Sequence, residues 1–241
     1  MSKNVPLSQR DGKADLTRGI LKRAVQLGIQ LLLLAAILFI SSGRLDWWMA
    51  WVLLGIFVVG IVINSFILLR RNPELIAERA EVKEDIKGWD SVLSILILLS
   101  AIGTLLVAGL DVRFAWSPQI PPTLRLLALV LVVLGYAFAS WALITNAFFA
   151  PTVRIQEERG HVVVSEGPYR FVRHPGYTGW ILSGLALPVG LGSLWALLPA
   201  GLASIFLIKR AALEDRTLRE ELAGYEDYAQ RVRYRLLPGV W

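Results

Sequence analysis

Four long apolar runs constrain this chain more than any other feature of its sequence. They lie at 24–42, 47–69, 91–110 and 124–145, and each is close to the roughly 20 mostly apolar residues that a helix needs to cross a bilayer. Because 55% of the residues are hydrophobic and only 18% are charged, an ordinary soluble domain and a disordered chain are both excluded. The sequence therefore predicts an all-α integral membrane protein.

The number of crossings depends on two shorter apolar runs near the C-terminus. They lie at about 177–189 and 193–208 and are separated by the turn-forming stretch PVGLGS. We expect either about six transmembrane segments, or four plus a re-entrant helical hairpin. The first run is longer than the roughly 7–15 apolar residues of a signal peptide, so we expect it to be a retained helix.

Basic residues gather in alternate connections between the apolar runs. The N-terminal tail, the 70–90 segment, the 146–175 segment and the C-terminal tail together hold 22 of the 25 Lys and Arg residues. The positive-inside rule then places both termini and these segments in the cytoplasm. Membrane topology accounts for the net charge of +6, so we expect no nucleic-acid partner. The short loops favour a bacterial cytoplasmic membrane, with an endomembrane as the alternative.

The expected organisation has three parts. A cytoplasmic tail covers 1–23, a four-span scaffold covers 24–145, and a catalytic region covers 146–241 with a cofactor-binding segment, the helical hairpin and a C-terminal cytoplasmic helix. Within the scaffold, we expect Asn64 to form an interhelical hydrogen bond. The charged 70–90 segment is interpreted as a solvated amphipathic helix.

Residue counts exclude several kinds of chemistry. The chain has no cysteine and two histidines, which rules out disulfides, thiolate nucleophiles and iron–sulfur clusters. A His-rich metal site is also not expected, so we predict no metal.

A first polar cluster begins at Asn146. VRIQ (153–156) and HVVV (161–164) are interpreted as short extended pieces, with a turn at 166–168. Pro175 disfavours the α conformation at His174, which therefore should lie just before a helix start. Free backbone N–H groups at such a position can bind anions.

A second polar cluster follows the last apolar run. We expect a helix from 193–208 to continue to about Ala223 and to end at Gly224. Arg210 and Glu214 are four residues apart on one face, where an ion pair can meet the polar end of an amphiphile. From spacing alone, a surface ion pair and an interfacial belt formed by Tyr225, Tyr228 and Tyr234 explain this cluster as well as a functional site does.

The two clusters together resemble the isoprenylcysteine carboxyl methyltransferase family, within a wider group that includes phospholipid methyltransferases. The resemblance covers about 141–238. Its most specific stretch is GPYRFVRHPGYTG at 167–179, followed by Glu-Asp-x-x-Leu at 214–218. The remaining matching positions are Gly224, Tyr225, Tyr228, Val232, Leu237 and Pro238.

The resemblance implies an integral-membrane enzyme that uses S-adenosylmethionine in a cytoplasmic pocket, with a tunnel toward the bilayer. The absence of a GxGxxG stretch after a strand agrees with this. By resemblance, Glu214 pairs with the amino group of the cofactor, and Arg210 is the catalytic residue that faces a methyl-accepting carboxylate. The implied cofactor contacts are Gln156, His161, Val162, Val163, Val164, Tyr169, His174, Pro175, Gly176 and Tyr177.

The implied reaction is methyl transfer to an amphiphilic or lipophilic acceptor at the cytoplasmic face, most like isoprenylcysteine carboxyl O-methylation. Membrane lipids, a lipophilic small molecule and a prenylated substrate are the expected partners. The residue types suit this chemistry, since a sulfonium cation is stabilised beside tyrosine rings and an ammonium group needs a carboxylate. The alternatives are an NADPH-dependent sterol-reductase-like enzyme and a non-enzymatic membrane subunit.

Overall fold

The computed structural model describes residues 7–81 and 86–241, and every regular element in these two ranges is helical. Short 3-10 turns η1 (Glu157–Arg159) and η2 (Gly167–Arg170) lie in the polar segment that follows α5. The α-helices are α1 (Leu7–Ser42), α2 (Trp48–Arg71), α3 (Pro73–Glu78), α4 (Gly88–Phe114), α5 (Pro122–Thr145), α6 (Pro175–Leu191), α7 (Leu197–Glu221) and α8 (Tyr225–Arg231).

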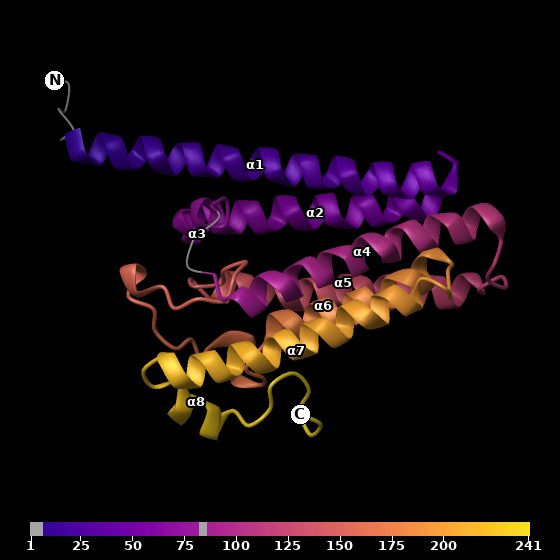
Figure 1. The fold of residues 1–241 in the computed structure, drawn as a ribbon. Coiled ribbons are helices and arrows are strands. Elements are labelled where there is room, and N and C mark those ends of the chain that lie inside the picture. The colour runs from indigo at the N-terminus through magenta and orange to yellow at the C-terminus, as the bar shows by residue number, and fades with distance from the viewer. Residues whose placement is uncertain (1–6, 82–85) are drawn as a thin grey trace.

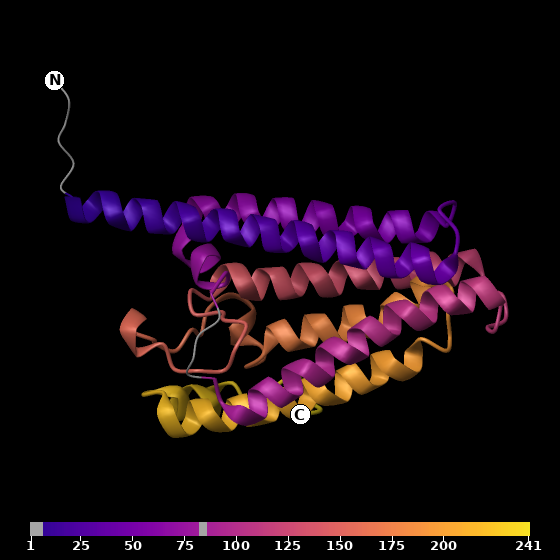
Figure 2. The same ribbon diagram turned by 45° about the horizontal axis from the view of Figure 1, so that its top comes forward.

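The long helices form an elongated bundle (Figure 1). The connections α1–α2, α4–α5 and α6–α7 all lie at one end, whereas α3, α8 and the 146–174 segment lie at the other (Figures 1 and 2). Helix α5 packs mainly on α6, and α4 packs on both α7 and α1. Residues from the first and last thirds of the chain are thereby brought to the same end of the bundle.

Four helices are long and apolar enough to cross a membrane, which confirms the predicted runs. The candidate spans are Asp15–Ser42, Trp48–Arg71, Gly88–Phe114 and Pro122–Thr145. Only 11% to 33% of the most apolar window of each span is buried inside the bundle. Such large exposed apolar faces are stable where lipid, rather than water, is the solvent.

Helices α6 and α7 form a hairpin whose turn lies beside the α4–α5 connection. Gly192 ends α6 with a left-handed φ of 89°, a conformation that favours glycine. The next residue, Ser193, donates its hydroxyl to Asp111 Oδ2 at 2.5 Å. The same carboxylate accepts the backbone N–H of Ser117 at 2.7 Å. The hairpin therefore extends to the level at which α4 ends.

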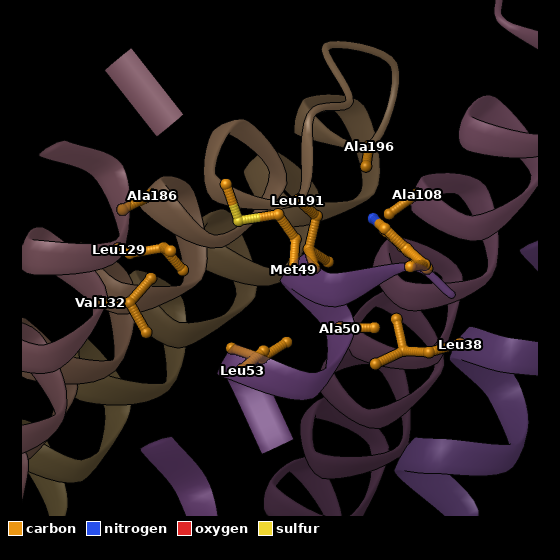
Figure 3. Close-up of a cluster of buried hydrophobic side chains, with 11 residues drawn as sticks. Leu38, Met49, Ala50, Leu53, Ala108, Leu129, Val132, Ala186, Leu191 and Ala196 are labelled. Atoms are coloured by element: carbon orange, nitrogen blue, oxygen red, sulfur yellow. The ribbon is translucent and has the colours of Figure 1, made fainter. Parts of the chain in front are cut away.

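A hydrophobic core holds the bundle together near these connections. Figure 3 shows side chains of Leu38 from α1, Met49 and Leu53 from α2, and Val132 from α5 in one cluster, with Leu191 of α6 beside Met49. All five side chains are fully buried. Since the best-packed apolar core lies at this end, the opposite end relies more on polar contacts.

Several local predictions are confirmed and others are wrong. Asn64 Nδ2 donates to Ser140 Oγ at 2.9 Å, so the predicted interhelical hydrogen bond is present. Residues 153–156 and 161–164 belong to neither a helix nor a strand, so their extended conformation stays a prediction. Helix α1 begins at Leu7, inside the segment expected to be a tail.

The 70–90 segment differs from a simple solvated helix. Its described part contains α3, where Leu75 and Ile76 are buried, and α3 packs against α1 and α2. Residues 82–85 lie outside the described ranges. Helix α3 therefore packs on the bundle instead of projecting from it.

Candidate functional site

A cavity lies at the end of the bundle opposite the main core. Its wall is formed by the 146–174 segment and by α6, α7 and α8. Both polar clusters of the sequence therefore meet here. The empty space within it and at its open mouth is about 910 Å³.

All but two of the predicted site residues line this cavity. Gln156 does not, because its buried amide donates to the Phe148 carbonyl at 2.7 Å and accepts from Arg159 at 2.6 Å. Pro175 occupies the first turn of α6, where its missing N–H costs nothing. The residues that do line the cavity are His161, Val162, Val163, Val164, Tyr169, His174, Gly176, Tyr177, Arg210 and Glu214.

Glu214 presents a half-buried carboxylate to the cavity. Its Oε2 accepts the hydroxyl hydrogen of Tyr177 at 2.5 Å. No Lys, Arg or His within the described ranges lies at ion-pair distance from Glu214, although the neighbouring arginines all have carboxylate partners. Arg210 contributes positive charge from beyond ion-pair distance, so the carboxylate of Glu214 is still able to accept charge-assisted hydrogen bonds from a cationic ligand group.

Arg210 pairs with Asp90 and not with Glu214, which excludes the surface ion pair that the i,i+4 spacing left open. Its Nε and Nη2 donate to the two carboxylate oxygens of Asp90 at 2.6 and 3.1 Å. Nη2 also donates to the Pro151 carbonyl at 2.7 Å. Arg210 thus joins α7 to the start of α4, and its guanidinium lies 5.8 Å from the centre of the Tyr177 ring.

Asp215 anchors the Arg173-His174 pair that precedes α6. This fully buried carboxylate accepts from Arg173 Nε at 2.6 Å, Arg235 Nε at 2.9 Å and the Tyr225 hydroxyl at 3.0 Å. His174 Nε2 lies 3.3 Å from the same carboxylate. His174 occupies the predicted position before the helix start, but its ring faces Asp215 and contributes to this network.

The loop that carries His161 is folded back on itself. The His161 ring stacks on Phe148 with a centroid distance of 4.5 Å, and its Nδ1 accepts the backbone N–H of Gln156 at 3.3 Å. Burial, followed by the positive charges of Arg159 and Arg154, lowers the pKa of His161 to about 4. The imidazole is therefore neutral at neutral pH.

Tyrosines form much of the inner wall of the cavity. Tyr225 and Tyr228 are only 4% and 1% exposed, so the interfacial-belt interpretation is wrong for them, whereas Tyr234 is 38% exposed. Burial raises the pKa of Tyr169 above its usual range. The phenol of Tyr169 stays protonated and accepts from Asn146 Nδ2 at 3.2 Å.

Sequence reasoning missed several residues that shape this site. Phe149 and Trp180 line the cavity with their rings in edge contact at 5.8 Å. Asp215 directly follows Glu214 and could have been considered, whereas nothing in the sequence connects Asp90 with a partner 120 residues away. In the described part of the chain, no three His, Asp or Glu side chains are grouped as a metal site requires.

The fold and the cavity define a class of protein: a helical membrane protein with a polar-lined cavity at one end of its bundle. Comparison with known families identifies the region that forms this site. Residues 127–220 match the isoprenylcysteine carboxyl methyltransferase (ICMT) family, so this part of the chain is similar to that family. The resemblance expected from the two motifs is confirmed.

Curated relatives match part of the chain as well. A probable protein-S-isoprenylcysteine O-methyltransferase of Oryza sativa subsp. japonica is 33% identical over 107 residues, which are 43% of this chain and 56% of the rice protein. Protein-S-isoprenylcysteine O-methyltransferase B of Arabidopsis thaliana is 31% identical over 107 residues, 43% of this chain and 54% of that protein. The chain thus spans about half the length of the curated relatives that it matches.

Proposed function

We propose that this protein transfers a methyl group from S-adenosylmethionine to an amphiphilic acceptor at a membrane surface. The observation that carries the proposal is Glu214, a half-buried carboxylate with no basic group at ion-pair distance among the described residues, on the wall of the cavity. The match of residues 127–220 to the methyltransferase family supports it independently.

The wall suits each charged part of S-adenosylmethionine. We assign Glu214 to the amino group, because an ammonium donates charge-assisted hydrogen bonds to a carboxylate. The rings of Tyr177 and Tyr169 can stabilise the sulfonium cation. When bound, the sulfonium supplies the electrophilic methyl group.

The opposite wall suits the nucleoside part. We assign it to His161, Val162, Val163 and Val164, because this stretch is partly apolar and the neutral imidazole is already stacked on Phe148. Gln156 supports the assignment by fixing the loop on which Phe148 and His161 lie. Gly176 allows close contact, since a Cβ there would lie 2.8 Å from the Phe149 ring.

Arg210 is proposed to act on the acceptor side. Its Nε and Nη2 are occupied by Asp90 and Pro151, whereas Nη1 has no hydrogen-bond partner among the described residues. Nη1 can donate to the acceptor while Asp90 fixes the guanidinium. Because methyl transfer is an in-line displacement, this chain contributes alignment and charge, and no covalent nucleophile is needed.

We extend the proposal to the identity of the acceptor, the side of the membrane and the number of crossings. The acceptor is an isoprenylcysteine carboxylate or a related amphiphile, and the cavity faces the cytoplasm, the side that the basic segments indicate. We also propose six crossings, because the turn of the α6–α7 hairpin hydrogen-bonds to Asp111 at the end of α4.

Calorimetric titration of S-adenosylmethionine into detergent-purified protein tests the proposal. Glu214→Gln should weaken binding by about tenfold or more, because a charge-assisted hydrogen bond is lost. Glu220→Gln is the matched control, since Glu220 lies on the same helix but pairs with Arg216 in solvent. Equal affinity of wild type and Glu214→Gln would remove Glu214 from the site.

The same titration separates the competing functions. Binding of NADPH without binding of S-adenosylmethionine would favour a reductase. Binding of neither ligand would favour a non-enzymatic subunit.

A further inference from the structure

A second cavity lies next to the first and is separated from it by Phe149 and Trp180, which line both. Its wall is formed by α1, α2, α5 and the residues around α3, and its volume is about 710 Å³ including the open mouth. Most of this wall lies outside residues 127–220, the region that matches the family.

Two arginines give this cavity a positive end. Arg79 Nη1 donates to the Phe149 carbonyl at 2.9 Å. Arg23 makes only long contacts, 3.4 Å to Gln26 and 3.5 Å to the Arg79 carbonyl. Within the described ranges, no carboxylate lies at ion-pair distance from either arginine, and no acidic residue lines the cavity. Most of their N–H donors therefore have no protein acceptor.

The two guanidiniums are close enough to affect each other. Burial and the charge of Arg23 lower the pKa of Arg79 to about 10, so both remain charged at neutral pH. Two like charges in a partly buried cavity cost free energy unless an anion compensates them. Arginine pairs bind phosphate and carboxylate groups well because of their planar donor geometry.

The remainder of the cavity is mainly apolar. Leu27 and Ile61 line it and are half-buried, and the buried Leu68 lies deeper. Arg23 immediately precedes the apolar run 24–42, and Arg79 follows α3. The positive end is therefore at the border of the apolar bundle, and the apolar wall extends among the helices.

We propose that this second cavity binds an anionic membrane amphiphile, with its phosphate or carboxylate head on Arg23 and Arg79 and its chain along Leu27 and Ile61. An alkyl phosphate, a fatty carboxylate and the phosphate of a lipid headgroup share this chemistry. The site is distinct from the cavity of the proposed cofactor and does not depend on the proposed function.

Binding can be measured in an uncharged maltoside detergent by tryptophan fluorescence, to which Trp180 in the cavity wall contributes. Dodecyl phosphate and dodecanoate should bind, and dodecanol should bind at least about tenfold more weakly, because only the anions engage both arginines. Inorganic phosphate distinguishes an amphiphile from a free anion as the ligand. Weaker binding than that of dodecyl phosphate shows that the alkyl chain is required. Binding equal to that of dodecyl phosphate shows that the site takes free anions and overturns the amphiphile proposal.

Substitutions locate the site. Arg79→Gln and Arg23→Gln should each weaken dodecyl phosphate binding about tenfold or more. Arg71→Gln should not, because Arg71 is exposed and outside the cavity. Glu214→Gln should also leave it unchanged. If Arg79→Gln lowers the melting temperature in detergent and so disturbs the fold, Arg23→Gln decides. Wild-type affinity in Arg23→Gln, or equal binding of dodecanol and dodecyl phosphate, would overturn the proposal.

Discussion

At the scale of single residues, two buried aspartates organise the cavity. Asp90 fixes Arg210, and Asp215 fixes Arg173 and His174. Each carboxylate is fully buried and compensated by several donors, which a buried charge requires. Glu214 lines the cavity itself and has no basic group at ion-pair distance among the described residues, and this difference is the physical reason for assigning it to a ligand.

The Asp215 network can be tested by stability. Asp215→Asn should lower the free energy of unfolding by about 3–5 kcal/mol, because the buried Arg173 loses its counter-charge. Thermal unfolding in detergent measures the effect. Asp227→Asn is the control, since this aspartate is exposed on α8. Equal melting temperatures for the two variants would contradict the anchoring role.

Some of the residues at the cavity could be predicted from the sequence and others could not. Glu214, Tyr177 and the 161–164 stretch were found because they lie in compact motifs, and all of them line the cavity. The role of Asp90 could not be found, because its contact with Arg210 depends on how α4 packs on α7. The alternative of an Arg210–Glu214 surface pair is excluded for the same reason, because Asp90 of a distant helix is the partner of Arg210.

At the scale of elements, the close packing of α5 on α6 positions the part of the cavity wall that α6 forms. A Cβ on Gly179 would lie 2.4 Å from the Gly135 carbonyl oxygen and 2.6 Å from the Ala139 backbone nitrogen. The two helices approach so closely because both have glycine at the contact, as in other membrane helix pairs. The apolar runs predicted the helices, but not which glycines touch.

Glycine substitutions test this contact. Gly179→Ala should destabilise the protein by about 1–3 kcal/mol, because the added methyl group would overlap backbone atoms that cannot rotate away. Gly184→Ala on the same helix should be tolerated, since nothing lies within 4 Å of its Cβ position. The melting temperatures of the two variants provide the comparison, and a loss confined to Gly184→Ala would contradict this packing.

At the scale of the whole molecule, the end with the helix connections and the end with the cavities differ in what they contain. The hydrophobic core near the helix connections stabilises the bundle, and the opposite end carries two cavities. Buried ion pairs support the wall of the first cavity. Hydropathy was sufficient to predict the four candidate spans. It could not predict the hairpin geometry, because the turn at Ser193 is positioned by a hydrogen bond to Asp111.

Transfer of a labelled methyl group tests the central claim most directly. Membranes containing the wild-type protein, Glu214→Gln or Glu220→Gln would be incubated with S-adenosylmethionine labelled in its methyl group, and label would be counted in the material extracted by organic solvent. We expect label above background for wild type and Glu220→Gln, and a loss of about tenfold or more for Glu214→Gln at limiting cofactor. Background label for a wild-type protein that binds the cofactor, or equal label in all three membranes, would contradict methyl transfer at this cavity.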